Sequence, residues 1–226
     1  MKSIHLRNRS SNLPAGLQDA TINHGILFLD PSIAPWLTSL SFSAQFALMR
    51  TNVPEGLWLE FGTATGSTAK TIADHLSPDK KLYTFDCFTG LPEDWGLHKA
   101  GHFAQTPPEL DKNKIQIIEG LFKDSLPTFL VEHEEKICFI HIDCDLYSST
   151  KTVLELLKDR IVRGTIIAFD EYFDHNSLTE DFNDPQPRAI TENGESKAFL
   201  EFAEQNNIKY QFICSSLNHS ATCIIL

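Results

Sequence analysis

The sequence lacks the features that mark several large classes of protein. Lysine and arginine number 19 against 30 aspartate and glutamate residues, which gives a formal net charge of -11 at pH 7. That charge opposes nucleic-acid backbones and anionic membrane surfaces, so neither is expected as a partner. No apolar run approaches the roughly 18 residues that a membrane-spanning helix requires, and residues 1–12 lack the apolar core of a secretory signal. We therefore expect a cytoplasmic protein.

Cysteine is present without the spacing of a zinc site or a disulfide framework. The cysteines form no CxxC pair and are odd in number: Cys87, Cys138, Cys144, Cys214 and Cys223. Free thiols in a reducing compartment are therefore expected. A chain of 226 residues, 42% hydrophobic, can fill one core without disulfides or a structural metal.

Short β-rich runs alternate with helical patterns from residue 57 onward. This order predicts an α/β fold in which crossover helices cover both faces of a parallel sheet. Helices are expected at residues 67–79, 150–162 and 194–205, with Ser67 or Thr68 as the N-cap of the first. Strands are expected at residues 57–61, 81–87, 115–120, 137–143, 165–172, 208–214 and 220–226.

The last two strands are separated by a short turn, which makes them antiparallel. The prediction is a doubly wound, mostly parallel, Rossmann-like sheet with one antiparallel C-terminal strand. Residues 33–49 have a helical pattern, so residues 1–50 are interpreted as an N-terminal helical extension of a domain at 51–226. Two polar stretches, 88–111 and 172–193, are long for such connections, and loops of this length are commonly lids or mobile segments.

The stretch LEFGTATGSTAK, residues 59–70, forms a glycine-containing turn between a strand and a helix. In doubly wound folds this turn meets the cofactor. The dinucleotide fingerprint GxGxxG would place a glycine where Ala64 stands, so an NAD-dependent oxidoreductase is disfavoured. Glu60, before the first glycine, suits a positively charged ligand such as the ammonium and sulfonium of S-adenosylmethionine.

Asp86 ends the second strand of the domain, some twenty residues after Gly66. From this place a carboxylate can bind both hydroxyls of an adenosine ribose. The alternative interpretation is that the glycines only make a tight turn and that Asp86 is a solvated strand end.

Acidic residues also follow two later strands: Asp143 and Asp145 end one, and Asp170 and Glu171 end the next. Neighbouring parallel strands would bring these carboxylates to one edge of the sheet, where α/β proteins bind their ligands. Clustered carboxylates favour a compensating cation, and hard oxygen ligands suit Mg²⁺. We predict a divalent metal bound by Asp143, Asp170 and Glu171.

Strand alternation puts His141, Asp143 and Asp145 on one side, which leaves Asp145 near the metal with a role of its own. A metal lowers the pKa of a coordinated hydroxyl, and a nearby carboxylate can then remove its proton. Asp145 is therefore the predicted general base, although an aspartate at a helix start can also be a simple cap. His141 is interpreted as a structural strand histidine, and Cys144 as a packing residue.

With these residues in hand, the chain resembles class I S-adenosylmethionine-dependent methyltransferases, and among them the macrocin O-methyltransferase (TylF-type) family of metal-dependent sugar O-methyltransferases. The likeness covers most of residues 57–172. It is carried by LEFGTATGSTAK, YTFDCFTGLPEDW, FIHIDCDLYSSTKTVLELL and GTIIAFDEY, with the weaker GESKAFLEF near the C-terminus.

The resemblance implies a role for each matching residue. Glu60 and Gly62 would contact the methionine part of the cofactor, and Asp86 the ribose. The adenine would lie near Glu119 and Gly120. The cofactor-binding residues expected in full are Glu60, Gly62, Thr63, Gly66, Ser67, Asp86, Cys87, Phe88, Glu119, Gly120 and Asp143. Asp143, Asp170 and Glu171 would bind the metal, and Asp145 would be the base.

The chain departs from the family where its last metal-binding strand ends in Asp170-Glu171 instead of paired aspartates. The acidic stretch at 174–188 is where the acceptor would be selected. The expected activity is methyl transfer from S-adenosylmethionine, with Mg²⁺ or a similar cation, to a hydroxyl of a small molecule such as a natural-product sugar. A catechol-type enzyme for aromatic diols, a binding subunit without catalysis and a homo-oligomer all stay open.

Overall fold

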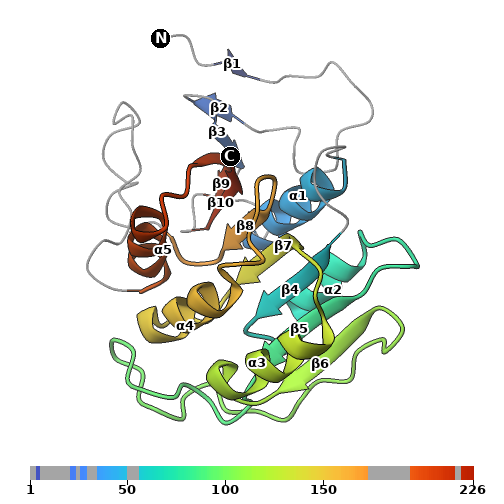
Figure 1. The fold of residues 1–226 in the computed structure, drawn as a ribbon, viewed down its shortest axis with the longest axis vertical. Coiled ribbons are helices and arrows are strands. Elements are labelled where there is room, and N and C mark those ends of the chain that lie inside the picture. The colour runs from blue at the N-terminus through green and yellow to red at the C-terminus, as the bar shows by residue number, and fades with distance from the viewer. Residues whose placement is uncertain are drawn as a thin grey trace.

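The computed structural model describes residues 4–5, 21–23, 26–29, 35–49, 56–172, 194–216 and 220–226. One twisted sheet runs through the molecule (Figure 1). Its strands are β1 (Ile4–His5), β2 (Thr21–Asn23), β3 (Ile26–Leu29), β4 (Leu57–Phe61), β5 (Leu82–Asp86), β6 (Ile115–Glu119), β7 (Ile137–Ile142), β8 (Ile166–Phe169), β9 (Tyr210–Ser216) and β10 (Ala221–Ile225). The helices are α1 (Pro35–Met49), α2 (Ser67–Ala73), α3 (Phe122–Glu132), α4 (Tyr147–Leu157) and α5 (Gly194–Gln205).

The order across the sheet is β1-β2-β3-β9-β10-β8-β7-β4-β5-β6. The strands from β9 to β6 form the predicted doubly wound sheet, in which β10 runs antiparallel to both β8 and β9. Parallel pairing joins β8 to β7, β7 to β4, β4 to β5 and β5 to β6. The predicted fold class, with its one antiparallel C-terminal strand, is confirmed.

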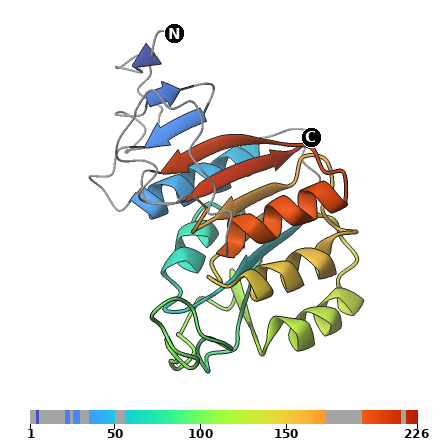
Figure 2. The ribbon, with the colours of Figure 1, turned by 90° about the vertical axis from the view of Figure 1, so that its left-hand side faces the viewer.

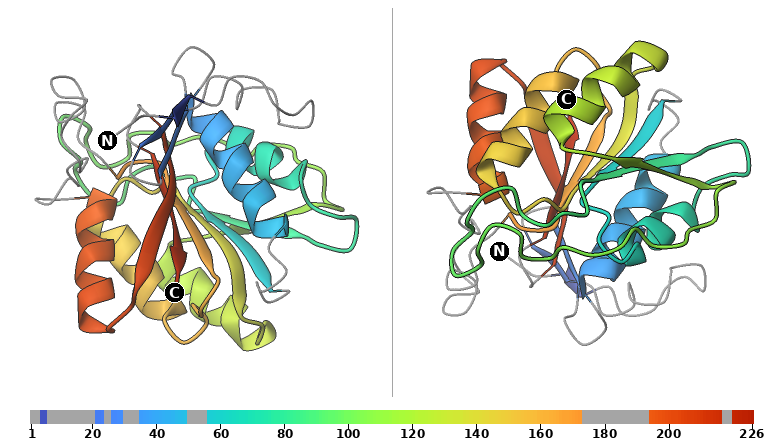
Figure 3. Two further views of the ribbon diagram at one scale, coloured as in Figure 1. Left: turned by 90° about the horizontal axis from the view of Figure 1, so that it is seen from above. Right: turned by 90° about the horizontal axis from the view of Figure 1, so that it is seen from below.

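Helices cover both faces of this sheet, which explains why its central strands are apolar along their whole length. Seen from above, α1 and α2 lie on one side of the sheet and α3, α4 and α5 on the other (Figure 3). Every residue of β4 and β7 is consequently buried. Strands buried on both faces read as continuous apolar runs without alternation.

Three local expectations need correction. Helix α2 ends at Ala73, earlier than predicted, and its N-cap is Gly66 with φ 76° and no side-chain cap, so Ser67 and Thr68 do not cap it. Glycine takes this left-handed conformation without steric cost. Helix α3 was not predicted; Leu126 and Phe129 supply its buried face, but Pro127 interrupts the helical pattern.

The N-terminal segment contributes strands as well as the predicted helix. Helix α1 lies within the range expected to be helical, whereas β1 to β3 were not predicted, because runs of two to four residues carry little pattern. Strand β3 pairs in parallel with β9 and so continues the sheet beyond the doubly wound part (Figure 2). Helix α1 is joined to the last strand region by hydroxyl pairs, Ser39 with Ser220 at 2.9 Å and Ser43 with Thr222 at 2.8 Å.

None of the five cysteines, all of which lie in the described ranges, forms a disulfide. Among the helices that the structure describes, none combines the length and apolar character needed to cross a membrane. The predicted polar stretch at 88–111 is described in full, whereas residues 173–193, which include His175 and the proposed acceptor-selecting segment, lie outside the described residues.

The contact between α1 and the chain after α2 should make stability depend on pH. His75 Nε2 lies 2.7 Å from Ser41 Oγ, and burial lowers the pKa of His75 despite the opposing charge of Asp74. Because the unfolded chain binds the proton more readily, this histidine reduces the free energy of unfolding as the pH falls below about 6.5. Urea unfolding of wild type and His75→Gln from pH 8 to 5 should show wild type losing more stability; parallel curves would contradict this.

Candidate active site

The acidic side chains meet because β7 and β8 are neighbours in register. Ile142 pairs with Phe169, so Asp143 and Asp170 are the next residues on adjacent strands. The Asp170 amide donates to the Ile142 carbonyl at 2.9 Å, which continues the ladder to these positions. The predicted adjacency of the two strand ends is thus present.

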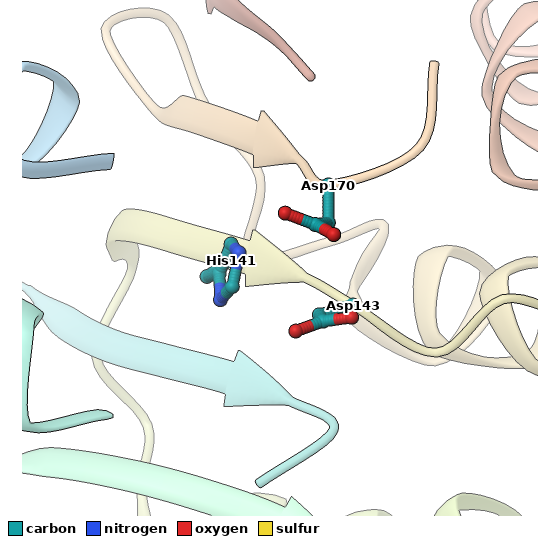
Figure 4. Close-up of side chains that lie close together, drawn as sticks. All are labelled: His141, Asp143 and Asp170. Atoms are coloured by element: carbon teal, nitrogen blue, oxygen red, sulfur yellow. The ribbon is translucent and has the colours of Figure 1, made fainter. Parts of the chain in front are cut away.

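One possible metal-binding atom from each of His141, Asp143 and Asp170 lies within 4.8 Å of the other two. Figure 4 shows one oxygen of each carboxylate turned toward the imidazole. Such a group of two carboxylates and one imidazole fits a divalent cation, and the nitrogen ligand widens the choice beyond Mg²⁺. Glu171 is not part of this close group, so the geometry offers His141 as the third ligand where the sequence suggested Glu171.

His141 is held by a row of polar side chains that crosses the sheet. Glu60 is paired in register with His141 on one side and Thr84 on the other. Its carboxylate lies 3.1 Å from His141 Nδ1 and accepts from Thr84 Oγ1 at 2.6 Å, and Thr84 contacts Thr63 Oγ1 at 2.6 Å. A carboxylate on one ring nitrogen is the usual partner of a metal-binding histidine, because it sets the tautomer.

Glu60 was expected to contact the methionine part of a cofactor. Its side chain is fully buried and engaged with His141 and Thr84, and it is absent from the lining of the cavity described below. The structure therefore shows Glu60 bound to His141 and Thr84, and its contact with a cofactor stays a prediction.

Asp86 organises the glycine turn. Its Oδ2 accepts from the amides of Thr63 at 3.0 Å and Ala64 at 2.9 Å, and its Oδ1 accepts from the Phe88 amide at 2.8 Å. Ala64 and Phe88 both have positive φ, 44° and 55°, which costs free energy for residues other than glycine. The carboxylate thus stabilises two strained loops, and its Oδ1 can accept a further hydrogen bond.

Gly62 lets the turn approach the end of β7. A Cβ at this position would lie 1.7 Å from the Asp143 carbonyl oxygen, and φ is 101°. The Asp143 amide donates to the Phe61 carbonyl at 2.9 Å, so the two strand ends are directly joined. No residue with a side chain fits here without moving one of them.

A cavity of about 670 Å³ opens over these strand ends. Ligand pockets of small-molecule enzymes have this size. Its wall includes Gly62, Asp86, Cys87, Gly120, Asp143 and Asp145. Among the described residues, four acidic side chains and one lysine, Lys123, line it. The cavity therefore suits a ligand that carries positive charge.

The cavity lining does not include the remaining predicted cofactor residues, which are Thr63, Gly66, Ser67, Phe88 and Glu119. Thr63 and Phe88 are buried in the loops that Asp86 stabilises. Gly66 and Ser67 begin α2, and Glu119 ends β6 next to Gly120. Their part in binding stays a prediction.

Several carboxyl groups of the site have raised pKa values because they are buried close to one another. Burial raises the pKa of Asp145 to about 6, with Asp170 adding to the effect and His98 opposing it. Burial also raises the pKa of Glu171 to about 7, assisted by Asp145 and Asp170. The pKa of Asp143 is raised well above its ordinary value, by burial first and by Asp170 next. A cation among these carboxyls would relieve this mutual repulsion.

The segment at 88–111 forms an ordered wall beside Asp145. It closes on itself through bonds from the Leu91 amide to His102 and from the Gly101 amide to Leu91, each 2.8 Å. Ser148 at the start of α4 donates to Glu93 at 2.6 Å and ties the wall to the acidic side of the cavity. The rings of His98 and His102 stack with centroids 4.3 Å apart, and Phe103, which lines the cavity, meets His102 edge-on at 4.3 Å.

Glu195 is a site residue that the sequence did not reveal. It opens α5 and is fully buried, yet it accepts hydrogen bonds from backbone amides at the ends of both β7 and β8. The sequence marks only a glutamate after Gly194 at a helix start, where acidic residues are common. Burial of this position depends on the packing of α5 against α4, which no local pattern specifies.

Known proteins that are similar in sequence to this chain are methyltransferases. A family model described as a methyltransferase domain matches residues 59–172. A curated relative, the 8-demethyl-8-(2,3-dimethoxy-alpha-L-rhamnosyl)-tetracenomycin-C 4'-O-methyltransferase of Streptomyces olivaceus, is 25% identical over 140 residues, 53% of this chain. The chain spans about half of that relative's length, 52%.

Solved structures share the fold. The calicheamicin methyltransferase CalS11 superposes with a TM-score of 0.60 and 21% identity, over 83% of this chain and 77% of the other. The O-methyltransferase NovP gives a TM-score of 0.58 and 20% identity, over 83% and 78%. Fold and cavity together define a Rossmann-like protein of the methyltransferase class. The chain belongs to the family of the matching methyltransferase domain.

Replacement of Gly62 tests the close approach of the two strand ends. Gly62→Ala should lower the free energy of unfolding by about 2 kcal/mol more than a control, because the new Cβ meets the Asp143 backbone. Gly101→Ala is the matched control: its φ is 85°, but no atom lies within 4 Å of the added Cβ, so it incurs only the left-handed strain of about 1–2 kcal/mol. Equal losses in urea unfolding would contradict the steric interpretation.

Proposed function

We propose that the protein is a metal-dependent O-methyltransferase that moves a methyl group from S-adenosylmethionine to a hydroxyl of a small molecule, in the manner of the TylF-type family. The observation that carries the proposal is a cavity whose wall combines Gly62 and Asp86 with Asp143 and Asp145. The residues proposed to bind the cofactor and the residue proposed to accept the proton therefore line the same cavity.

The glycine turn and Asp86 suit the methyl donor. The turn presents backbone that can approach a ligand closely, and Asp86 is placed for the ribose. S-adenosylmethionine carries a sulfonium and an ammonium, and the acidic lining of the cavity favours both charges over the phosphates of a dinucleotide.

Asp143 and Asp170, with His141 or Glu171, would hold the cation, which lowers the pKa of the acceptor hydroxyl when bound. Asp145 takes the hydroxyl proton. The acceptor oxygen then attacks the methyl carbon in line with the carbon–sulfur bond, and the sulfur leaves with the electron pair as a thioether. The protein's main contribution to this step is alignment of the two reactants.

A sugar is the acceptor that we favour. The curated relative is named as a methyltransferase of a rhamnosyl group, and CalS11 as a methyltransferase of calicheamicin. In this chain Phe103 lines the same cavity as Asp143 and Asp145, and its ring meets that of His102 edge-on. Aromatic side chains of this kind offer apolar faces to a ring while the carboxylates bind its hydroxyls.

Asp145→Asn separates catalysis from binding. Asp145 has φ 60°, a conformation that asparagine also tolerates, so the backbone should be preserved. We expect the transfer rate to fall by about 10²- to 10⁴-fold because the amide cannot accept the proton. Donor affinity measured by calorimetry should stay within about twofold of wild type; an active variant would remove Asp145 from the role of base.

Asp86→Ala should instead weaken the binding of the methyl donor. The substitution removes the acceptor of three backbone amides and the proposed ribose ligand, so affinity for S-adenosylmethionine should fall by at least about tenfold. Unchanged donor affinity in calorimetry would show that the donor is bound elsewhere.

The function itself is tested by titrating the protein with S-adenosylmethionine and assaying methyl transfer to a panel of glycosides and catechols, with and without EDTA. We expect donor binding in both conditions and transfer only without EDTA. Donor binding without transfer to any acceptor would favour a binding subunit, and preferential transfer to catechols would replace the sugar assignment.

A further inference from the structure

Glu195 joins the two acidic strand ends through their backbone. Its Oε1 accepts from the Cys144 amide at 2.9 Å and the Asp145 amide at 3.2 Å, and its Oε2 accepts from the Glu171 amide at 3.3 Å. One carboxylate thus spans from the segment after β7 to the segment after β8. Its fully buried position means that water does not replace these bonds.

The segment that Glu195 holds includes a residue in an uncommon backbone conformation. Asp145 has φ 60°, in the left-handed region where non-glycine residues are strained. Such conformations persist when surrounding contacts hold them. Two consecutive amides converging on one carboxylate oxygen supply that restraint, and they fix the direction in which the Asp145 side chain leaves the backbone.

The position of Glu195 is itself determined by the fold. It lies in the first turn of α5, where the helix dipole favours negative charge, and Gly194 before it has φ 80°. A buried carboxylate without a positive partner is costly, and its three amide donors are the compensation that the described residues show. An apolar side chain at this position would leave these amides without their acceptor, at a cost of about 1–3 kcal/mol for each buried donor.

We propose that Glu195 is a positioning residue that sets the spacing between Asp145 and the acidic end of β8. The catalytic part of this inference rests on the proposed function; the backbone restraint does not. Glu195 touches neither substrate nor cofactor in this arrangement. It acts through the amides of Cys144, Asp145 and Glu171, and it thereby aligns the base with the residues that would hold the cation.

Amide hydrogen exchange tests the restraint without any need for turnover. In wild type, the amides of Cys144, Asp145 and Glu171 should exchange at least about tenfold more slowly than the amide of Leu97, whose side chain is 97% exposed. Exchange of all three at the rate of Leu97 would overturn the proposal. This measurement needs no variant, so it decides the question even if substitutions of Glu195 do not fold.

Glu195→Gln gives a sharper result, because an amide side chain retains one accepting oxygen and loses the other. The oxygen should keep the two donors of the β7 end, so exchange at Glu171 should accelerate by about tenfold while Cys144 and Asp145 stay protected. Glu195→Asp, which preserves the charge on a shorter arm, should recover part of the lost protection at Glu171. Unchanged exchange at Glu171 in the glutamine variant would overturn the two-ended restraint.

The kinetic test separates positioning from general stability. Glu195→Gln should lower kcat for methyl transfer by about tenfold with unchanged affinity for S-adenosylmethionine, because the donor end is held by Gly62 and Asp86. Glu201→Gln is the matched control: Glu201 lies on the same helix but accepts from the Tyr147 hydroxyl, not from a backbone amide of either strand end. It should leave both quantities unchanged.

The outcomes are distinguishable. A parallel fall of kcat, donor affinity and thermal stability in Glu195→Gln would assign Glu195 a structural role and overturn the proposal. Failure of wild type to methylate any acceptor would instead reject the proposed function, while the exchange measurement would still decide whether Glu195 restrains the two strand ends.

Discussion

The architecture of the site depends on one close approach, that of the turn after β4 to the end of β7. The Phe61 carbonyl accepts the Asp143 amide, and Gly62 leaves no room for a side chain at the Asp143 backbone. This contact sets the glycine turn and the acidic strand end at a fixed separation on one sheet edge. Because both belong to the hydrogen-bonded ladder, the geometry is maintained by the whole sheet, which is more rigid than a loop.

The buried polar side chains next to this contact form one connected row of hydrogen bonds. The row formed by Thr63, Thr84, Glu60 and His141 lies under the glycine turn and reaches the proposed metal ligands. A buried network of this kind stabilises one arrangement only when each member is bonded, since an orphaned member would cost about 1–3 kcal/mol. The glycine turn and the acidic strand end are therefore connected through one hydrogen-bonded network.

The sequence predicted the features that depend on local pattern. Apolar strand runs, each followed by a helix, were enough for the fold class, and acidic residues placed directly after β7 and β8 were enough to expect Asp143 and Asp170 together. It could not show that Glu60 is turned beneath the turn or that His141 joins the acidic pair, since both depend on cross-strand register. Glu195 escaped notice for the same reason: its partners are about fifty and twenty-four residues away along the chain.

The pairing of β3 with β9 has a practical consequence for handling this protein. A sheet margin with open amides and carbonyls recruits other chains, and here the margin of the doubly wound core is covered by strands from the beginning of the sequence. Shortened versions that start at residue 35 would uncover β9, so self-association during expression is the hazard to watch for when such versions are made.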